Sequence, residues 1–373
     1  MHILFACGGT GGHINPALAV AGYIRELHPD AQISFVGNKS GMESTLVPKA
    51  GYDFYPIHVA GFQRKITPKN ICRNVDALVK MFTSSAEASA LLKRLKPDVV
   101  VGMGGYVSGP VLRKAHQLGI KTATHEQNAF PGITTKALLK YVDTVMLAMP
   151  DAQKRLPDTR EYVITGNPVR GELLTTTRQQ ARKHLGIDPD GIMILSFGGS
   201  LGAKRINEVV AALIAQYTAN ASVYHYHATG KFGKEWMPAM VERMGCKIKE
   251  HRNLRVTEYI HDMNFCMAAA DLVICRAGAI TLSELAAQGK ASILIPSPNV
   301  AENHQYHNAM TLGERDAAVV IEEKDLTEEL LIQTVSELVA QPQKLKEMGQ
   351  NAKKVAITDA CQRIYDQIIK LVH

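Results

Sequence analysis

The stretch Ile3-Leu-Phe-Ala-Cys7-Gly8-Gly-Thr-Gly-Gly12-His13-Ile-Asn-Pro16 joins a short apolar run to a cluster of glycines. Apolar residues then recur at helical spacing over residues 16–27, so we predict a strand, a glycine loop and a helix. This order brings backbone N–H groups and the positive end of a helix to one point, which suits a diphosphate. Such a loop also occurs simply to let a helix pack on its strand, so it is weak evidence alone.

The same order returns in the second half of the chain. A predicted strand over residues 192–197 is followed by Gly198-Gly-Ser200-Leu-Gly202 and by a helical pattern that begins near Ile206. The chain has 373 residues, which fits two domains at about 150 residues each. We therefore predict two similar α/β domains.

Buried-type strands alternate with helical patterns in both halves, which predicts parallel sheets with right-handed crossovers. The further strands are predicted over residues 32–36, 98–102, 121–125, 144–147, 162–164, 222–227, 254–257, 272–275 and 292–295. Gly166-Asn-Pro168 breaks the pattern after the strand at 162–164, so we place the domains at residues 1–165 and 166–351. After the second domain, apolar residues recur at helical spacing over residues 352–373, which predicts a C-terminal helix.

Composition excludes several classes of protein. Hydrophobic residues make up 46% and charged residues 21%, as in ordinary globular chains. Six cysteines without any CxxC pair argue against structural zinc and disulfides and favour a reducing cytoplasm. The net charge of +7 favours anionic partners. No stretch has the composition of a membrane span.

Glycine turns follow predicted strands at four places, Gly8, Gly102, Gly198 and Gly278. Neither half has GxGxxG followed by a ribose-binding acid at the usual distance, and GxxxxGK[ST] is absent, which disfavours a dinucleotide oxidoreductase and a P-loop kinase. After Gly278 the predicted helix carries Glu284 a turn beyond the expected phosphate position. This carboxylate could accept both hydroxyls of a ribose, or it could merely compensate the helix dipole.

Six segments, taken together, carry a more specific pattern. They are Gly8-Gly-Thr-Gly-Gly-His13, Gly102-Met-Gly-Gly-Tyr-Val-Ser-Gly-Pro110, His125-Glu-Gln-Asn128, Gly166-Asn-Pro-Val-Arg170, Gly198-Gly-Ser-Leu-Gly-Ala203 and Cys275-Arg-Ala-Gly-Ala-Ile-Thr-Leu-Ser-Glu284. In order and spacing they resemble the MurG family, the UDP-N-acetylglucosamine:undecaprenyl-pyrophosphoryl-N-acetylmuramyl-pentapeptide N-acetylglucosaminyltransferases of bacterial peptidoglycan synthesis.

The resemblance implies an α/β fold of the GT-B type, with two Rossmann-like doubly wound domains facing a cleft. The C-terminal helix, at 352–373, would pack back on the first domain. The implied reaction is inverting transfer of GlcNAc from UDP-GlcNAc to the 4-hydroxyl of MurNAc in lipid I, which gives lipid II. The donor would lie mainly on the second domain and the lipid-linked acceptor on the first.

The resemblance also implies roles for individual residues. Ile260 would meet the uracil through its backbone, Glu284 the ribose, and Gln305 and Asn308 the sugar. The diphosphate and the remaining substrate contacts would involve Ser200, Arg170, Ala279, Ile280, Thr281, Leu282 and Ser283, with Thr10, Gly11, Gly12 and Asn128 from the first domain and Gly104, Gly105 and Tyr106 on the acceptor side. Some family members have two glutamines where this chain has His304-Gln305, so Gln305 alone carries over securely.

Two residues are candidates for the general base. His13 follows the first glycine loop, and imidazole titrates near neutrality. It could instead cap or pack a helix start. Glu126 is the rival base, and it could instead be a salt-bridged carboxylate that holds its loop.

We expect neither a metal nor a cofactor. The one Asp-x-Asp triplet, Asp188-Pro-Asp190, has the composition of a turn. His225 and His227 share a strand face but have no third ligand nearby in the sequence, so we interpret them as packed or solvent-facing. Helix N-termini and Arg170 would then stabilise the leaving UDP.

A lipid-linked acceptor implies a peripheral enzyme on the cytoplasmic face of the cell membrane, where other cell-wall synthesis proteins are candidate partners. Residues 61–82 combine apolar residues at helical spacing with surrounding cations, which fits docking on an anionic inner leaflet. An amphipathic helix that covers the domain core would give the same pattern. The apolar set is Ile71, Val75, Leu78, Val79 and Phe82, and the cations are Arg64, Lys65, Lys69, Arg73 and Lys80.

Three rival functions are weaker. A retaining or non-membrane glycosyltransferase of the same fold should lack the pair of His125–Asn128 and Gly102–Tyr106 segments. A UDP-sugar epimerase would need no lipid and would place its acids and its histidine around UDP-GlcNAc alone. A nucleic-acid binder would use the positive charge, but no basic helix interleaved with aromatic residues exists, so we expect no nucleic acid as partner.

Overall fold

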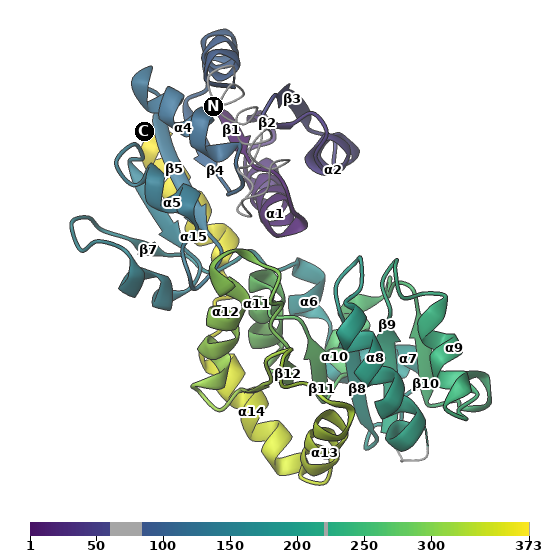
Figure 1. Ribbon diagram of the computed structural model, residues 1–373. Helices are drawn as coiled ribbons and strands as arrows, with labels where there is room; N and C mark the ends of the chain where they lie inside the picture. The colour runs from purple at the N-terminus through teal and green to yellow at the C-terminus, as the bar shows by residue number, and fades with distance from the viewer. Residues whose placement is uncertain (60–83, 220–222, 373) are drawn as a thin grey trace. The chain divides into compact units, whose positions relative to one another are not determined.

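The computed structural model describes residues 1–59, 84–219 and 223–372. The chain forms two units (Figure 1), the first made of Met1–Pro168 and Asp359–His373 and the second of Val169–Thr358. The sequence pattern placed the boundary between residues 165 and 166, and the structure places it at Pro168–Val169.

The first unit holds a seven-stranded parallel sheet in the order β3-β2-β1-β4-β5-β6-β7. Its strands are β1 (His2–Ala6), β2 (Gln32–Asn38), β3 (Asp53–Ile57), β4 (Val99–Gly102), β5 (Lys121–Glu126), β6 (Thr144–Leu147) and β7 (Val163–Ile164). Its helices include α1 (Gly11–Leu27), α2 (Glu43–Lys49), α4 (Ser108–Gln117), α5 (Ile133–Leu138) and α15 (Ala360–Val372).

Strand β1 lies between β2 and β4 in the sheet, and all five of its residues are buried. Phe5 lies on the face covered by α1 and α15, where its ring stacks on Phe35 at 5.3 Å between centroids. Leu4 points to the opposite face, toward the residues of α4. Apolar helices on both faces explain why the strand sequence is a continuous apolar run.

Helix α15 ends the chain but packs in the first unit, against α1 and strands β4 and β5, and Figure 1 shows it in yellow beside that sheet. Ile364 and Ile368 are fully buried there, and Tyr365 hydrogen-bonds His28 Nε2 at 2.6 Å. The continuous helix predicted over 352–373 is divided in the structure, because α14 ends at Lys354 and α15 begins at Ala360. Asp359 starts α15 by accepting both the backbone N–H and the Nε–H of Arg363, at 3.0 and 2.8 Å.

The second unit holds a six-stranded parallel sheet in the order β10-β9-β8-β11-β12-β13. Its strands are β8 (Ile192–Phe197), β9 (Val223–Ala228), β10 (Leu254–Thr257), β11 (Leu272–Cys275), β12 (Ala291–Leu294) and β13 (Ala318–Val320). Its helices include α6 (Gly171–Thr175), α7 (Arg178–Leu185), α8 (Lys204–Leu213), α9 (Trp236–Arg243), α10 (Met263–Ala269), α11 (Ala279–Gln288), α12 (His304–Gly313), α13 (Glu328–Val339) and α14 (Pro342–Lys354).

Both sheets are doubly wound, as predicted, and the strand order reverses between β1 and β4 in the first and between β8 and β11 in the second. Ligands of such sheets bind beyond the carboxyl ends of the strands at this reversal. The four predicted glycine turns follow these four strands. The topology therefore places one pair of glycine turns at the expected binding edge of each unit.

Two edge strands were not predicted, β3 and β13. β3 contains Pro56, which cannot donate to a ladder and is tolerated only at an edge, and β13 has three residues. Among the described residues, no helix is both long enough and apolar enough to cross a bilayer. The segment predicted to dock on the membrane, 61–82, lies outside the described residues.

Candidate functional site

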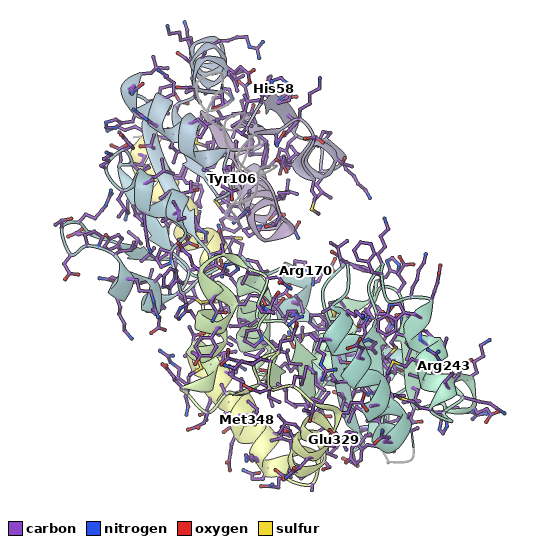
Figure 2. The ribbon with its side chains drawn as sticks, in the orientation of Figure 1. His58, Tyr106, Arg170, Arg243, Glu329 and Met348 are labelled. Atoms are coloured by element: carbon purple, nitrogen blue, oxygen red, sulfur yellow. The ribbon has the colours of Figure 1, made fainter. Side chains whose placement is uncertain are left out.

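The two glycine turns of the first unit touch each other. A Cβ atom on Gly105 would lie 2.3 Å from the carbonyl oxygen of Gly8, and Gly105 has φ +83°, so only glycine fits. Ser108 holds the second turn in place because its hydroxyl lies 2.9 Å from the carbonyl of Ala6 and 3.0 Å from that of Gly104. Tyr106, on the same turn, is exposed (Figure 2).

His13 lies in the first turn of α1, and its ring orientation is fixed by two contacts. Nδ1 is 3.0 Å from the carbonyl oxygen of Gly8 and 3.4 Å from Thr10 Oγ1. A Cβ on Gly104 would lie 2.5 Å from the ring carbon Cδ2, so the imidazole needs glycine beside it. Because a carbonyl only accepts, the neutral ring carries its proton on Nδ1 and its lone pair on Nε2.

Glu126 is buried at the end of β5, and both of its oxygens are occupied. Oε1 accepts the backbone and side-chain N–H groups of Asn128, each at 3.0 Å. Oε2 accepts the N–H of Gly132 at 2.9 Å and the hydroxyl of Thr135 at 2.5 Å. Hydrogen bonds rather than a salt bridge therefore make this carboxylate the organiser of the loop after β5.

The neighbours of Glu126 also build the loop. His125 is buried, its Nε2 lies 2.9 Å from the Gly166 carbonyl, and burial lowers the pKa of its imidazole to about 4. Gln127 donates to the Met103 carbonyl at 3.0 Å, which links this loop to the glycine turn after β4. Gln127 was not predicted as a site residue, although it lies inside the His125–Asn128 segment.

In the second unit, two residues assigned to UDP contact each other. Arg170 Nη2 and Nε lie 3.2 and 3.3 Å from Oε1 of Glu284. The side chain of Arg170, labelled in Figure 2, is 55% exposed and that of Glu284 is 11% exposed, so an exposed arginine pairs with a buried acid. Burial raises the pKa of Glu284, and the charge of Arg170 opposes that shift.

Helix α11 begins beside this pair, with Gly278 as its N-cap residue. Its first turn gives a partial positive charge at the carboxyl edge of the sheet. Leu282 is buried in the core and the Ser283 hydroxyl donates to the Ala279 carbonyl at 3.1 Å, whereas Ile280 and Thr281 are half-buried. The side chains of Ile280 and Thr281 are therefore more accessible to a ligand than that of Leu282.

The glycine loop after β8 is open to solvent at Ser200. Gly199 and Gly202 have φ +92° and +84°, and a Cβ on Gly202 would lie 2.2 Å from the Thr229 carbonyl. Asn207 was not predicted as a site residue. Its side chain donates to the same Thr229 carbonyl at 2.8 Å, which keeps that carbonyl against Gly202. Its place in the first turns of α8 was the only available signal.

The remaining assigned residues differ in accessibility. Gln305 accepts the Ser297 N–H at 2.9 Å, which leaves its NH₂ group for a sugar hydroxyl. Asn308 is fully buried, and its side chain donates to the Ala277 carbonyl in the loop before α11 at 3.2 Å. Ile260 is also buried.

Two charged residues that contact the loops at the ends of the strands were not predicted from the sequence. Arg276 donates to the carbonyls of Ile295 and Pro296, both at 3.1 Å, and pairs with Glu323. Glu43 is fully buried in the first unit and accepts the Gly9 N–H. Glu43 follows a predicted strand by several residues, and no local pattern marks such a glutamate.

Among the described residues, no three His, Cys, Asp or Glu side chains form a group that could hold a metal ion. Asp188 Oδ1 accepts the Asp190 N–H at 2.8 Å, which is a turn contact. His225 and His227 are fully buried and both contact the Ser196 hydroxyl, at 2.7 and 2.8 Å. They are packed within the sheet.

Comparison with known proteins shows the family of the chain. The family models of the glycosyltransferase family 28 N-terminal and C-terminal domains match residues 3–147 and 193–364. A protein of Acetivibrio thermocellus named UDP-N-acetylglucosamine--N-acetylmuramyl-(pentapeptide) pyrophosphoryl-undecaprenol N-acetylglucosamine transferase is 45% identical over 370 residues, which cover 99% of this chain and 97% of the relative. The crystal structure of Acinetobacter baumannii MurG is 31% identical, with a TM-score of 0.81 and coverage of 99% of both chains.

This chain belongs to the MurG family. Its two doubly wound sheets are those of the GT-B fold, so the predicted fold is confirmed. The UDP-GlcNAc 2-epimerase of Neisseria meningitidis has the same fold at 12% identity and a TM-score of 0.65. That likeness extends to the fold alone, whereas the likeness to MurG proteins extends along the whole sequence.

Proposed function

We propose that this MurG-family chain transfers GlcNAc, with inversion, from UDP-GlcNAc to the 4-hydroxyl of MurNAc in undecaprenyl-pyrophosphoryl-MurNAc-pentapeptide. The observation that carries the proposal is the 45% identity, over 99% of this chain, to a protein named for that transfer. The donor is assigned to the second unit and the acceptor to the first.

Donor binding rests on the carboxyl edge of the second sheet. Glu284 is the acceptor for the ribose hydroxyls, and Arg170 and the start of α11 stabilise negative charge on the diphosphate. Gln305 offers its NH₂ group to the sugar. As UDP departs, Arg170 and the start of α11 are assigned to stabilising its growing negative charge.

His13 is assigned as the general base. The acceptor 4-hydroxyl gives its proton to Nε2, because Nδ1 is engaged with the Gly8 carbonyl. The hydroxyl oxygen forms a bond to the anomeric carbon, and the bond from that carbon to the β-phosphate oxygen breaks with its electron pair on UDP. Glu126 is assigned to positioning Asn128 and its loop, since four donors already occupy its oxygens.

The lipid-linked acceptor places the enzyme at the cytoplasmic face of the cell membrane as a peripheral protein. The net charge of +7 supports attraction to an anionic leaflet. Within the segment 61–82, the cations Lys65, Lys69 and Arg73 are assigned to that contact.

The proposal is tested by incubating the chain with radiolabelled UDP-GlcNAc and a short-chain lipid I analogue. Labelled lipid product and an equal amount of free UDP are expected. His13→Ala should lower turnover by about 100-fold or more and leave UDP affinity unchanged. Consumption of UDP-GlcNAc without acceptor would instead indicate an epimerase, and no labelled lipid would overturn the proposal.

A further inference from the structure

One peptide group of the first glycine loop lies between a buried carboxylate and the imidazole of His13. The Gly9 N–H donates to Oε2 of Glu43 at 3.2 Å. The carbonyl oxygen of Gly8, which belongs to the same peptide group, lies 3.0 Å from Nδ1 of His13. In a trans peptide the N–H and C=O point in opposite directions, so this group connects the two side chains.

The carboxylate is held in a socket that fits it closely. Glu43 is fully buried, and its Oε1 accepts the Asn38 N–H at 2.8 Å. A Cβ on Gly8 or Gly41 would lie 2.3 Å from a carboxylate oxygen of Glu43, and a Cβ on Gly37 would lie 2.4 Å from its Cγ. Three glycines thus leave just enough room for this side chain at this place.

We propose that Glu43 is a positioning residue that acts through the Gly8–Gly9 peptide to orient His13 and to make its Nε2 more basic. A carboxylate that accepts the N–H polarises the peptide and strengthens its carbonyl as an acceptor. That carbonyl holds the proton on Nδ1 and stabilises the imidazolium once Nε2 takes a second proton. The arrangement is a carboxylate–histidine dyad with a peptide group inserted between its members, and it rests on the assignment of His13 as the base.

Among the described residues, the segments in contact with this relay also carry three titratable groups, namely Cys7, Tyr106 and Lys39, which is exposed between Asn38 and Glu43. Burial, and to a lesser extent Glu43, raise the pKa of the Cys7 thiol far above neutrality, so it does not titrate in an assay near pH 7. Tyr106 is exposed on the turn after β4. At saturating UDP-GlcNAc, where the donor already occupies Glu284, the acid limb of kcat/KM for the acceptor is therefore assigned to His13.

The test compares Glu43→Gln with the wild type and with Glu26→Gln, a matched change of an exposed residue on α1. In Glu43→Gln one acceptor oxygen becomes an NH₂ group, and we expect kcat to fall by about 10- to 100-fold. The acid limb of kcat/KM should move to lower pH by about half a unit or more, because the imidazolium loses a stabilising partner. UDP affinity should not change in either variant, and Glu26→Gln should match the wild type throughout.

Two further measurements separate the relay from a merely structural role. In a His13→Ala background, Glu43→Gln should have no additional effect on kcat. In the wild type, ¹⁵N NMR with His13→Ala as the assignment reference should show the neutral ring of His13 protonated at Nδ1.

The outcomes distinguish this proposal from the assignment of the base. A lower kcat with an unshifted acid limb, or an equal loss in both backgrounds, would show that Glu43 only supports the loop. If the variants do not fold, a ring protonated at Nε2 in the wild type still overturns the relay. If His13→Ala keeps full turnover, the base assignment fails and the relay has no catalytic role, whatever the NMR shows.

Discussion

At the scale of single residues, the Arg170–Glu284 pair shows how a buried carboxylate is kept in its charged form. Burial raises the pKa of Glu284, and Arg170 is the group that opposes this shift. In the proposed donor complex, the ribose binds the carboxylate and the diphosphate binds the guanidinium, so each partner exchanges one charge-assisted contact for another. The pair therefore lowers the cost of keeping a carboxylate under the surface.

This predicts weaker UDP binding when either partner is removed, and a changed pH dependence when Arg170 is removed. Glu284→Ala and Arg170→Ala should each weaken UDP binding by about 1.5 to 3 kcal/mol, through loss of charge-assisted hydrogen bonds. Without Arg170, the pKa of Glu284 rises further, so acidification should weaken UDP binding at a higher pH in Arg170→Ala than in the wild type. Calorimetry with UDP between pH 5 and 8 measures both effects. Unchanged affinity in both variants would contradict the donor assignment.

The buried histidines of the second sheet predict sensitivity to acid. Burial lowers the pKa of His225 and of His227 to about 3, whereas an unfolded histidine titrates near 6.5. The unfolded state thus binds more protons between these values, and stability should fall as pH drops from about 6.5 toward 3. Each histidine contributes up to about 1.4 kcal/mol per pH unit.

Urea unfolding at pH 7 and pH 5 measures this loss. The single tryptophan, Trp236, lies on α9, so its fluorescence follows the second unit. In His225→Gln, the unfolded state should bind about one proton fewer at low pH. The free energy of unfolding should therefore depend less on pH than in the wild type. A free energy that is the same at both pH values in the wild type would contradict this account.

At the scale of elements, Asp271 ties helix α7 to the second sheet at the start of β11. It accepts Arg178 of α7 at 2.5 Å and Arg182 of the same helix at 2.6 Å, and it also accepts the Met193 N–H of β8 at 2.8 Å. Lys290 closes the neighbouring end of α10 by donating to the Ala268 and Ala270 carbonyls, at 2.7 and 2.9 Å.

Asp271→Asn should therefore destabilise the second unit strongly. The Arg182 side chain is 3% exposed and would lose its counter-charge, which costs about 3 to 5 kcal/mol for a buried pair. The matched control is Glu250→Gln, whose partner Lys247 is 73% exposed, and it should cost less than about 1 kcal/mol. Urea midpoints from Trp236 fluorescence compare the two. Similar midpoints would mean that the Asp271 cluster adds little net stability.

The elements also show what a single sequence can predict. The central strands and their glycine turns were predictable because long apolar runs and glycines mark them locally. β13 has only three residues, too few to show a periodicity. β3 contains Pro56, a residue that argues against a strand in a sequence pattern. The Glu43 socket joins the first glycine loop to residues 37–43, and a hydrogen bond between residues so far apart in the chain leaves no pattern in either segment.

At the scale of the whole molecule, the positive charge predicts binding to anionic membranes. Wild type should float with vesicles of anionic lipid and be released as salt rises, since each surface cation contributes about 1 kcal/mol at low salt. A Lys65→Glu, Lys69→Glu, Arg73→Glu triple variant should remain unbound. Turnover on a soluble acceptor serves as the check on its folding. Flotation of the triple variant like the wild type would mean that the docking surface lies elsewhere.

The first unit is built from two separate stretches of chain, and the second from one. On the ribosome, all of the second unit is synthesised before Asp359–His373 emerges. Until then, the apolar surface of the first unit that Ile364 and Ile368 cover stays exposed, and this unit cannot complete its core. The second unit has all of its residues by that time and can already fold. A premature stop codon near the end of the gene would thus damage the part of the enzyme that was made first.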